Sequence, residues 1–127
     1  MSWQAYIDTS LVGSGNVDSA AIFSVNGKDS WAHSANFKIS ADEMAELLKA
    51  FDDPNSAYAN GLKINGEKYT VIQVLDNVLR TKKGKEGLVA AKTVQALIIA
   101  HHPESVLTNA CSATVEQLAE YLKGVGY

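Results

Sequence analysis

The 127-residue sequence contains very little cysteine and proline, with one cysteine, Cys111, and two prolines. A single cysteine excludes a disulfide within the chain and favours a reducing compartment. No basic segment followed by an apolar run opens the chain, as a signal peptide would require. No apolar stretch approaches the roughly 18 residues that a membrane-spanning helix needs. We therefore expect a cytoplasmic protein without a transmembrane segment.

Recognisable catalytic and metal-binding motifs are also missing. The sequence has no P-loop, G-x-G-x-x-G, G-x-S-x-G or H-E-x-x-H pattern. His101 and His102 are adjacent, so on a strand they point to opposite faces and cannot share a metal ion. One cysteine with one histidine makes an incomplete zinc site. We expect a half-buried, unreactive Cys111 and no enzyme activity, metal or cofactor; the alternative is a small enzyme that uses Cys111 or His101.

Charge is unevenly distributed along the chain. The net charge is −3, yet residues 62–102 contain seven basic and three acidic residues, a local net charge of +4. Scattered charge of this kind is typical of a solvated surface. The alternative is a basic face for an acidic partner, for which we expect a protein or lipid and not a nucleic acid.

Helical periodicity occurs at both ends of the chain and in its middle. Ser2 is a plausible N-cap for a helix over residues 2–11, and apolar residues at helical spacing predict another over 114–127. Ser40 and Glu43 fit a capping box for an amphipathic helix over 40–51, with Met44 in the core. Pro54 ends that helix, and a further helical turn over 55–60 stops at Gly61.

Short β-prone runs occupy the remaining sequence, at 20–25, 30–33, 62–64, 68–74, 78–81, 88–91 and 96–101. Asn-Gly pairs at 26–27 and 65–66 predict two-residue hairpin turns, in which both residues have positive φ. Residues 76–77 are read as a loop and 82–87 as a polar turn. No helical pattern interrupts the last five strands. The sequence therefore predicts a single α+β domain, residues 1–127, with an antiparallel sheet and helices packed on its faces.

Large aromatic side chains are concentrated at the two chain ends. Trp3 and Tyr6 are three residues apart and hence neighbours on one helical face. Tyr121 lies on the shoulder of the last apolar stripe, and Tyr127 is the last residue. Chain ends fray unless they are tied down. We therefore expect these two ends to dock close together against the sheet.

Several segments resemble the profilins, a family of small actin-monomer-binding proteins. They are the opening MSWQAYID at 1–8, Trp31 after the first hairpin, the ending LAEYLKGVGY at 118–127, and the central segments 60–62, 66–69, 86–87, 92–93 and 96–101. The likeness covers the whole length and is nearest to profilins of fungi and other microbial eukaryotes. It implies a central antiparallel sheet with both terminal helices on one face and the other helices opposite. It also implies a non-enzymatic, monomeric protein of the cytoplasm and the actin cytoskeleton.

The resemblance further implies that the cleft between the terminal helices binds proline-rich segments such as those of formins. A polyproline II helix is ordered before it binds and presents carbonyl groups, while aromatic rings offer flat faces and N–H or O–H donors. The matching positions are Trp3, Tyr6, Trp31, Tyr121, Leu122 and Tyr127.

The same resemblance implies a surface for monomeric actin and an overlapping site for phosphatidylinositol 4,5-bisphosphate. Gln73 and the segments 78–81 and 108–110 differ from the residues usual in the family, and the alternative is a phosphoinositide-binding module of the membrane surface with weak actin affinity. The positions matching the actin surface are Tyr58, Ala59, Lys68, Gln73, Lys82, Lys92, Asn109, Ser112 and Gln117. The basic candidates for phosphoinositides are Arg80, Lys82, Lys83, Lys85 and Lys92.

Overall fold

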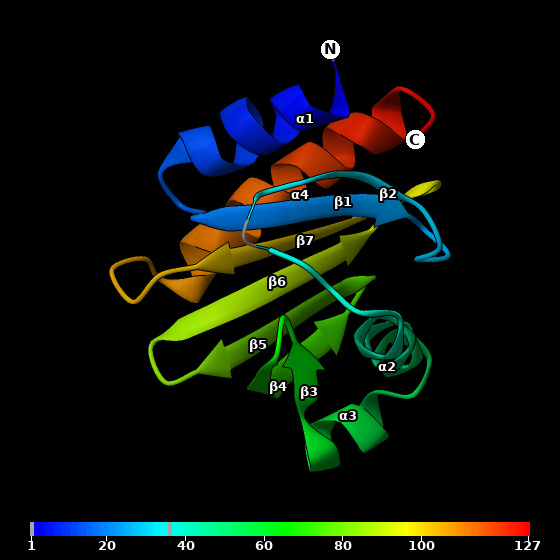
Figure 1. The fold of residues 1–127 in the computed structure, drawn as a ribbon, viewed down its shortest axis with the longest axis vertical. Helices are drawn as coiled ribbons and strands as arrows, with labels where there is room; N and C mark the ends of the chain where they lie inside the picture. Colours follow the sequence, from blue (N-terminus) through cyan, green and yellow to red (C-terminus); the bar gives the residue numbers. More distant parts are fainter. Residues whose placement is uncertain (1, 36) are drawn as a thin grey trace.

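The computed structural model describes residues 2–35 and 37–127, which fold around one seven-stranded antiparallel sheet (Figure 1). The helical elements are α1 (Trp3–Ala5), the π-helix η1 (Tyr6–Leu11), the 3₁₀ turn η2 (Val12–Ser14), α2 (Ala41–Asp52), α3 (Pro54–Asn60) and α4 (Thr108–Gly124). The strands are β1 (Ser19–Ser24), β2 (Ser30–His33), β3 (Leu62–Ile64), β4 (Glu67–Leu75), β5 (Val78–Lys83), β6 (Glu86–Lys92) and β7 (Ala96–His102).

The sheet has the order β2-β1-β7-β6-β5-β4-β3, and every neighbouring pair is antiparallel. The pairing of β1 with β7 joins the two halves of the chain, since it sets Ile22 opposite Ile98. The predicted α+β class is therefore confirmed. None of the helices in the described residues is long and apolar enough to cross a membrane.

Each face of the sheet carries its own layer of helices and its own apolar core. Ile7, Leu11 and Val115 bring the first helical segment and α4 onto one face, together with alternate strand residues such as Ile98. Leu47 of α2 packs on the other face among the intervening strand residues. Figure 1 shows α1 and α4 side by side on one side of the sheet, with α2 and α3 on the other. The predicted placement of terminal and internal helices is confirmed.

The predicted helix ends are formed by local hydrogen bonds. Ser2 Oγ accepts a bond from the backbone N–H of Ala5 at 3.2 Å. Ser40 and Glu43 exchange both bonds of a capping box, each at 3.1 Å. Pro54 occupies the first turn of α3, where its missing N–H leaves no donor unpaired. These bonds confirm where α1 and α2 begin.

The last helix differs from its predicted bounds, because α4 begins at Thr108 and ends at Gly124. The prediction of a start at residue 114 was wrong by six residues. Large apolar residues at helical spacing begin only at Val115, whereas the first two turns of α4 pack through the small side chains of Cys111 and Ser112. A periodicity of large side chains does not detect such close packing.

The hairpin turns also differ in part from the prediction. Asn65 and Gly66 have φ of 54° and 80°, as a two-residue turn requires. The turn predicted at residues 26–27 was wrong, since Gly27 alone of that pair has positive φ and a longer loop joins β1 to β2. There Asn26 Oδ1 accepts bonds from Ser24 Oγ and the Lys28 N–H. Residues 76–77, read as a loop, form a tight turn with φ of 54° and 65°.

Candidate functional site

Five aromatic side chains from both chain ends and β2 form one connected cluster, named here the aromatic cluster: Trp3, Tyr6, Trp31, Tyr121 and Tyr127. The Trp3 ring centroid lies 4.6 Å from that of Trp31, 5.6 Å from Tyr6 and 5.2 Å from Tyr127. Tyr6 continues the row to Tyr121 at 6.2 Å. The expected docking of the two ends against the sheet therefore brings the predicted aromatic residues together.

The rings of the aromatic cluster remain partly open to solvent. Tyr121 is 55% exposed and Tyr127 is 41% exposed, and Trp3 is half-buried against the core beneath. Leu122, predicted beside them, is only 1% exposed. Because it lies in the core, Leu122 supports the rings from below and offers almost no surface of its own. The cluster thus presents ring faces above an apolar base.

The tight turn near residues 93–95, which the sequence predicts between the last two strands, also holds the last residue in the aromatic cluster, a role that was not predicted. Thr93 Oγ donates to the carbonyl oxygen of Tyr127 at 2.6 Å, and the Gln95 N–H donates to the same oxygen at 2.5 Å. Gln95 Nε2 also donates to Gly126 at 2.8 Å. These contacts join residues more than 30 positions apart. The sequence of a polar turn between two strands does not indicate that its residues will hydrogen-bond to the end of the chain.

The surroundings of the Tyr6 hydroxyl disfavour its ionised form further than for an ordinary tyrosine. Burial raises the pKa of Tyr6, and the side-chain hydrogen bond with Tyr121 and the nearby phenols of Tyr121 and Tyr127 raise it further. A neutral phenol retains its O–H donor. The cluster can therefore offer both flat rings and hydrogen-bond donors at neutral pH.

A second surface surrounds a hollow between β4, β5 and the start of α4. Its apolar members, Ile72 and Leu107, are 48% and 78% exposed. Ile72 has no paired residue on β5, because the register between β4 and β5 shifts between Val71 and Gln73. The hollow brings together three of the predicted actin-surface residues, and the lining consists of Ile72, Gln73, Arg80, Lys82, Leu107, Thr108 and Asn109.

Other residues predicted for the actin surface lie around this hollow or away from it. Tyr58 is 43% exposed on α3, where its Oη accepts a bond from the Val74 N–H at 2.9 Å, and Ala59 beside it is exposed. Lys68 is exposed on β4. Gln117 lies on the side of α4 that faces Tyr6.

Ser112 and Lys92 differ most from what was expected of the actin surface. Ser112 is 1% exposed, so it offers almost nothing to a partner. Its hydroxyl accepts from Arg80 Nε at 2.9 Å and donates to Glu116 at 2.7 Å. Lys92 places its Nζ 5.2 Å from the centroid of the Phe51 ring. The side chains of both residues are therefore already engaged in contacts within the fold before any partner binds.

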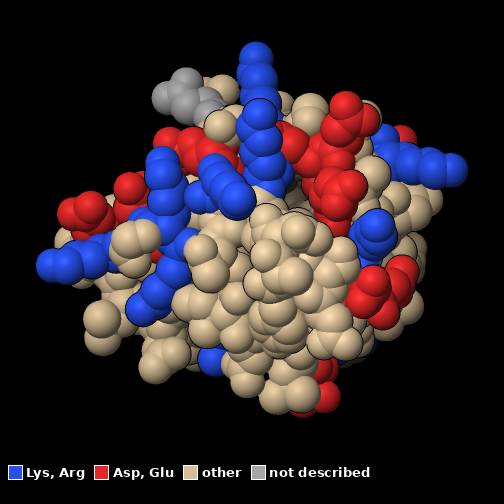
Figure 2. All heavy atoms as spheres, turned by 90° about the horizontal axis from the view of Figure 1, so that it is seen from below, with Lys and Arg blue, Asp and Glu red and all other residues tan. Residues whose placement is uncertain are grey.

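The basic residues predicted for phosphoinositides are not equally available. Arg80 pairs with Glu116 at 3.4 Å, and Lys83 pairs with Glu67 at 2.8 Å. The hydrogen bond from Lys83 lowers the pKa of the Glu67 carboxyl and raises the pKa of Lys83. Figure 2 shows Lys and Arg interspersed with Asp and Glu around a broad uncharged area.

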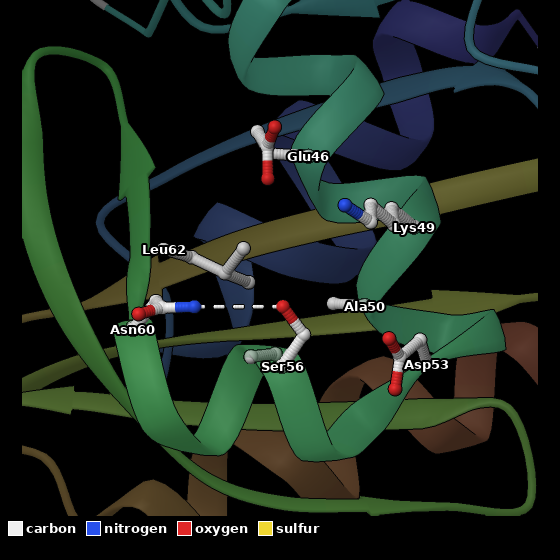
Figure 3. A pocket seen from close by; sticks show the side chains of 9 residues that line it. Glu46, Lys49, Ala50, Asp53, Ser56, Asn60 and Leu62 are labelled. Atoms are coloured by element: carbon white, nitrogen blue, oxygen red, sulfur yellow. Dashed lines mark hydrogen bonds between the residues drawn. The ribbon is translucent and has the colours of Figure 1, made fainter.

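The hollow between α2 and α3 lies apart from both surfaces. Figure 3 shows the Ser56 and Asn60 side chains of α3 facing the α2 side chains across it, and Asn60 Nδ2 donates to Ser56 Oγ at 3.5 Å. Its lining shares no residue with the aromatic cluster or with the hollow beside β4. We assign no function to this hollow.

The histidines of β7 face opposite sides of the sheet, as expected. His101 lies between Asp18 and Glu86, at 2.6 and 3.1 Å, whereas His102 bonds to Thr108 of α4 at 2.9 Å. Among the described residues, no group of three or more His, Cys, Asp or Glu side chains is arranged to hold a metal ion.

Cys111 is expected to resist modification in the native protein. Its side chain is fully buried, not half-buried as predicted, and burial raises the pKa of the thiol to about 12. Because the thiolate is the reactive form, 5,5′-dithiobis(2-nitrobenzoic acid) at pH 8 should react at least 100-fold faster in 6 M guanidinium chloride than in buffer. Equally fast reaction in both would contradict this burial and support the thiol-enzyme alternative.

A seven-stranded sheet whose terminal helices share one face, with exposed aromatic rings between the chain ends, defines a small α+β binding module. The sequence model of the family described as Profilin matches residues 1–127. The chain belongs to the profilin family.

Its relatives match over their whole length. The chain is 42% identical to profilin of Schizosaccharomyces pombe and 41% identical to profilin of Saccharomyces cerevisiae, with all of each chain covered. The crystal structure of the S. pombe protein has a TM-score of 0.94 over 99% of this chain and all of that one. Mouse profilin IIa, in complex with a double repeat from the FH1 domain of mDia1, shares the fold at 23% identity, with a TM-score of 0.83 and full coverage of both chains.

Proposed function

We propose that this protein is a non-enzymatic cytoplasmic adaptor that binds one actin monomer and one proline-rich segment and so regulates actin polymerisation. The observation that carries the proposal is the aromatic cluster, with Trp3 and Tyr127 in ring contact and Tyr127 still 41% exposed. Membership of the profilin family supplies the partners, monomeric actin and proline-rich proteins such as formins.

The aromatic cluster is suited to a proline-rich segment because the ligand is stiff and has few donors of its own. A polyproline II helix rises about 3.1 Å per residue. The rings of Trp31, Trp3 and Tyr6 follow one another at 4.6 and 5.6 Å, a row that spans roughly three such residues. Tyrosine O–H and tryptophan N–H groups can donate to the ligand carbonyls.

Actin would bind at the separate surface around the hollow between β4, β5 and α4. Exposed Ile72 and Leu107 supply apolar contact, and Lys82 supplies positive charge at the edge. Complementary charge chiefly raises the association rate and fixes orientation. An adaptor that holds both ligands delivers actin at high local concentration to whatever carries the proline-rich segment.

Phosphoinositides would bind weakly on this surface as a modulator of actin binding. Arg80 and Lys83 are paired with carboxylates, so Lys82 and Lys85 are the exposed basic side chains left for an anionic headgroup. Each contributes about 1 kcal/mol near an anionic leaflet. Two such residues favour the adaptor over a dedicated membrane-surface module.

Isothermal titration tests the proposal directly. Monomeric actin and a decaproline peptide are titrated separately into the protein, and each is expected to bind with a stoichiometry of one. If neither monomeric actin nor decaproline shows binding, whether by heat or by competition, the adaptor proposal is refuted. Binding only to vesicles that contain phosphatidylinositol 4,5-bisphosphate would favour the membrane-surface alternative.

Lys82→Glu is expected to slow association with monomeric actin about five- to tenfold at low salt, because it reverses an exposed charge at the edge of the hollow. Stopped-flow kinetics at two salt concentrations measure the rate, and the difference should shrink as salt rises. Lys28→Glu, an equal charge change on the loop between β1 and β2, is the control and should leave the rate within twofold. Equal rates for both variants would count against this surface.

A further inference from the structure

His102 is a buried histidine that lies outside both the aromatic cluster and the hollow beside β4. It is the last residue of β7, on the face of the sheet that α4 covers, and it is fully buried. Its Nδ1 lies 3.0 Å from the carbonyl oxygen of Pro103, and its Nε2 lies 2.9 Å from the hydroxyl of Thr108, the first residue of α4. The ring therefore spans the loop that joins β7 to α4, with one nitrogen at each end.

The hydrogen-bond partners of His102 suit the neutral ring. A carbonyl oxygen only accepts, so Nδ1 carries a hydrogen, and Nε2 of the neutral ring then accepts from the Thr108 hydroxyl. That hydroxyl makes no other hydrogen bond among the residues described. In the imidazolium form both nitrogens are donors. The Thr108 hydroxyl would then have to turn its hydrogen away from the ring.

No carboxylate contacts the His102 ring in the part of the chain that the structure describes. The His101 ring, with its centroid 6.5 Å away, faces the other side of the sheet, where it lies between Asp18 and Glu86. Glu104, on the loop itself, is exposed, so water screens its charge. A positively charged His102 ring would therefore lack an ion-pair partner.

The strands and the helix packed against His102 supply no negative charge either. Gly87 of β6 is its cross-strand partner, and an added Cβ there would lie 2.7 Å from Nε2. Lys82 of β5 pairs with Gly87, so a positive charge lies in the same cross-strand row. The next ionisable groups along α4 and along this face of β5 are neutral or already paired, and they are Cys111, Glu116 and Arg80. A proton on His102 would thus add an unpaired charge at a buried position, which is costly.

The loop that His102 spans carries one side of the hollow between β4, β5 and α4. Leu107, Thr108 and Asn109 belong to the lining of that hollow, and Leu107 is 78% exposed. Leu107 also occupies the N-cap of α4, where leucine has no oxygen to accept a bond from the first turn. The bond between His102 and Thr108 therefore ties the start of α4 to the sheet.

We infer that His102 is a pH-sensitive latch on the start of α4, closed while its ring is neutral and released when the ring is protonated. The inference rests on the proposed binding of actin around the hollow that this start of α4 lines. The aromatic cluster lies at the other end of α4, beside the C-terminus (Figure 1). Acid should therefore weaken the binding of actin and spare the binding of proline-rich segments.

The direction of the effect follows from proton binding. A histidine ring released into water takes up a proton below about pH 6.5, whereas the closed latch has no place for the charge. Lowering the pH therefore favours the released state, as for any histidine that is buried in its neutral form. Between pH 7.5 and pH 6.0 the proton favours a released ring about fourfold, which sets the upper limit of the loss in actin affinity from this residue.

Titration of monomeric actin into the wild-type protein and His102→Gln at pH 7.5 and pH 6.0 tests the latch. Glutamine keeps a donor and an acceptor but takes up no proton. The wild-type protein should bind actin about threefold more weakly at pH 6.0, and the affinity of His102→Gln should change by less than about 1.5-fold. Because the same actin is used throughout, the comparison cancels the pH dependence of actin itself.

Two controls accompany the actin titrations. His101→Gln removes the neighbouring histidine and should keep the wild-type response to pH. Decaproline affinity should stay within twofold at both pH values in every variant, which shows that each variant is folded and that acid acts on only one of the two surfaces.

NMR of the histidine ring nitrogens in the wild-type protein gives a measurement that needs no variant. At pH 7.5 the His102 ring should be neutral, with its hydrogen on Nδ1. A charged ring at pH 7.5, or a neutral ring with its hydrogen on Nε2, would overturn the latch.

The outcomes separate this inference from the proposed function. Equal pH responses in the wild-type protein and His102→Gln, with actin still bound, would overturn the latch alone. A response that disappears in His101→Gln and persists in His102→Gln would assign it to the other ring and also overturn the latch. Absence of actin binding at pH 7.5 would refute the proposed function, and this inference with it.

Discussion

Trp3→Ala should weaken binding of a decaproline peptide at least 30-fold while leaving affinity for monomeric actin within twofold. Trp3 is the ring that contacts three others, at 4.6, 5.6 and 5.2 Å, so its removal opens the middle of the aromatic cluster. A central aromatic anchor of an interface commonly contributes 2 kcal/mol or more, which corresponds to about 30-fold in affinity. Fluorescence anisotropy of a labelled peptide measures the first affinity and isothermal titration the second.

Two controls make the Trp3→Ala result interpretable. Trp3→Phe keeps a ring in the same place and should lose less than tenfold, because stacking survives without the indole N–H. Thermal unfolding shows whether the half-buried side chain also supports the fold. An equal loss of peptide and actin binding would indicate misfolding or one shared site, and would contradict two separate surfaces.

Gly61→Ala should reduce the free energy of unfolding by about 3 kcal/mol. Gly61 links α3 to β3 with φ 70° and ψ −171°, a conformation that is essentially restricted to glycine. A Cβ at this position would lie 2.6 Å from the Tyr69 carbonyl oxygen, a backbone atom that cannot move aside cheaply. Backbone strain of roughly 1–3 kcal/mol is therefore compounded by steric overlap.

Gly66→Ala is the matched control for Gly61→Ala. Gly66 also has positive φ, at 80°, but an added Cβ there meets nothing within 4 Å. Its cost should be about 1 kcal/mol, from the left-handed conformation alone. Urea unfolding of both variants gives the comparison, and equal destabilisation would show that the close approach to Tyr69 is not significant. Because Gly61 ends α3, the variant should also disturb Tyr58 on the proposed actin surface.

Much of the fold was predictable because local signals agreed with the global arrangement. The Ser40–Glu43 capping box, the Asn65-Gly66 turn and the glycine at the end of α3 each place an element boundary through local chemistry. Consecutive strands that are joined by short turns, with no helix between them, must then pair in an antiparallel sheet. The aromatic residues of the site stood out in the sequence because large rings at both chain ends are unusual where ends normally fray.

The unpredicted features depend on contacts between distant residues. Thr93 and Gln95 hold Tyr127 through hydrogen bonds that span more than 30 residues. Ile72 lies at a register shift between β4 and β5, and this shift depends on the partner strand as well as on its own. Ser112, predicted for the actin surface, is buried, and its hydroxyl bonds to Arg80 and Glu116. The family resemblance predicts which residue of this chain matches a known contact position. The packing around that residue determines whether its side chain reaches the surface.

Simultaneous binding is the central claim, and sedimentation velocity with three components measures it most directly. A fluorescently labelled decaproline peptide, the protein and monomeric actin are mixed at saturating concentrations and the label is followed. The account predicts that the label sediments with a complex of one actin and one copy of this protein, faster than with the protein alone. Release of the label when actin is added would show that the two ligands compete for one site, and would contradict the account.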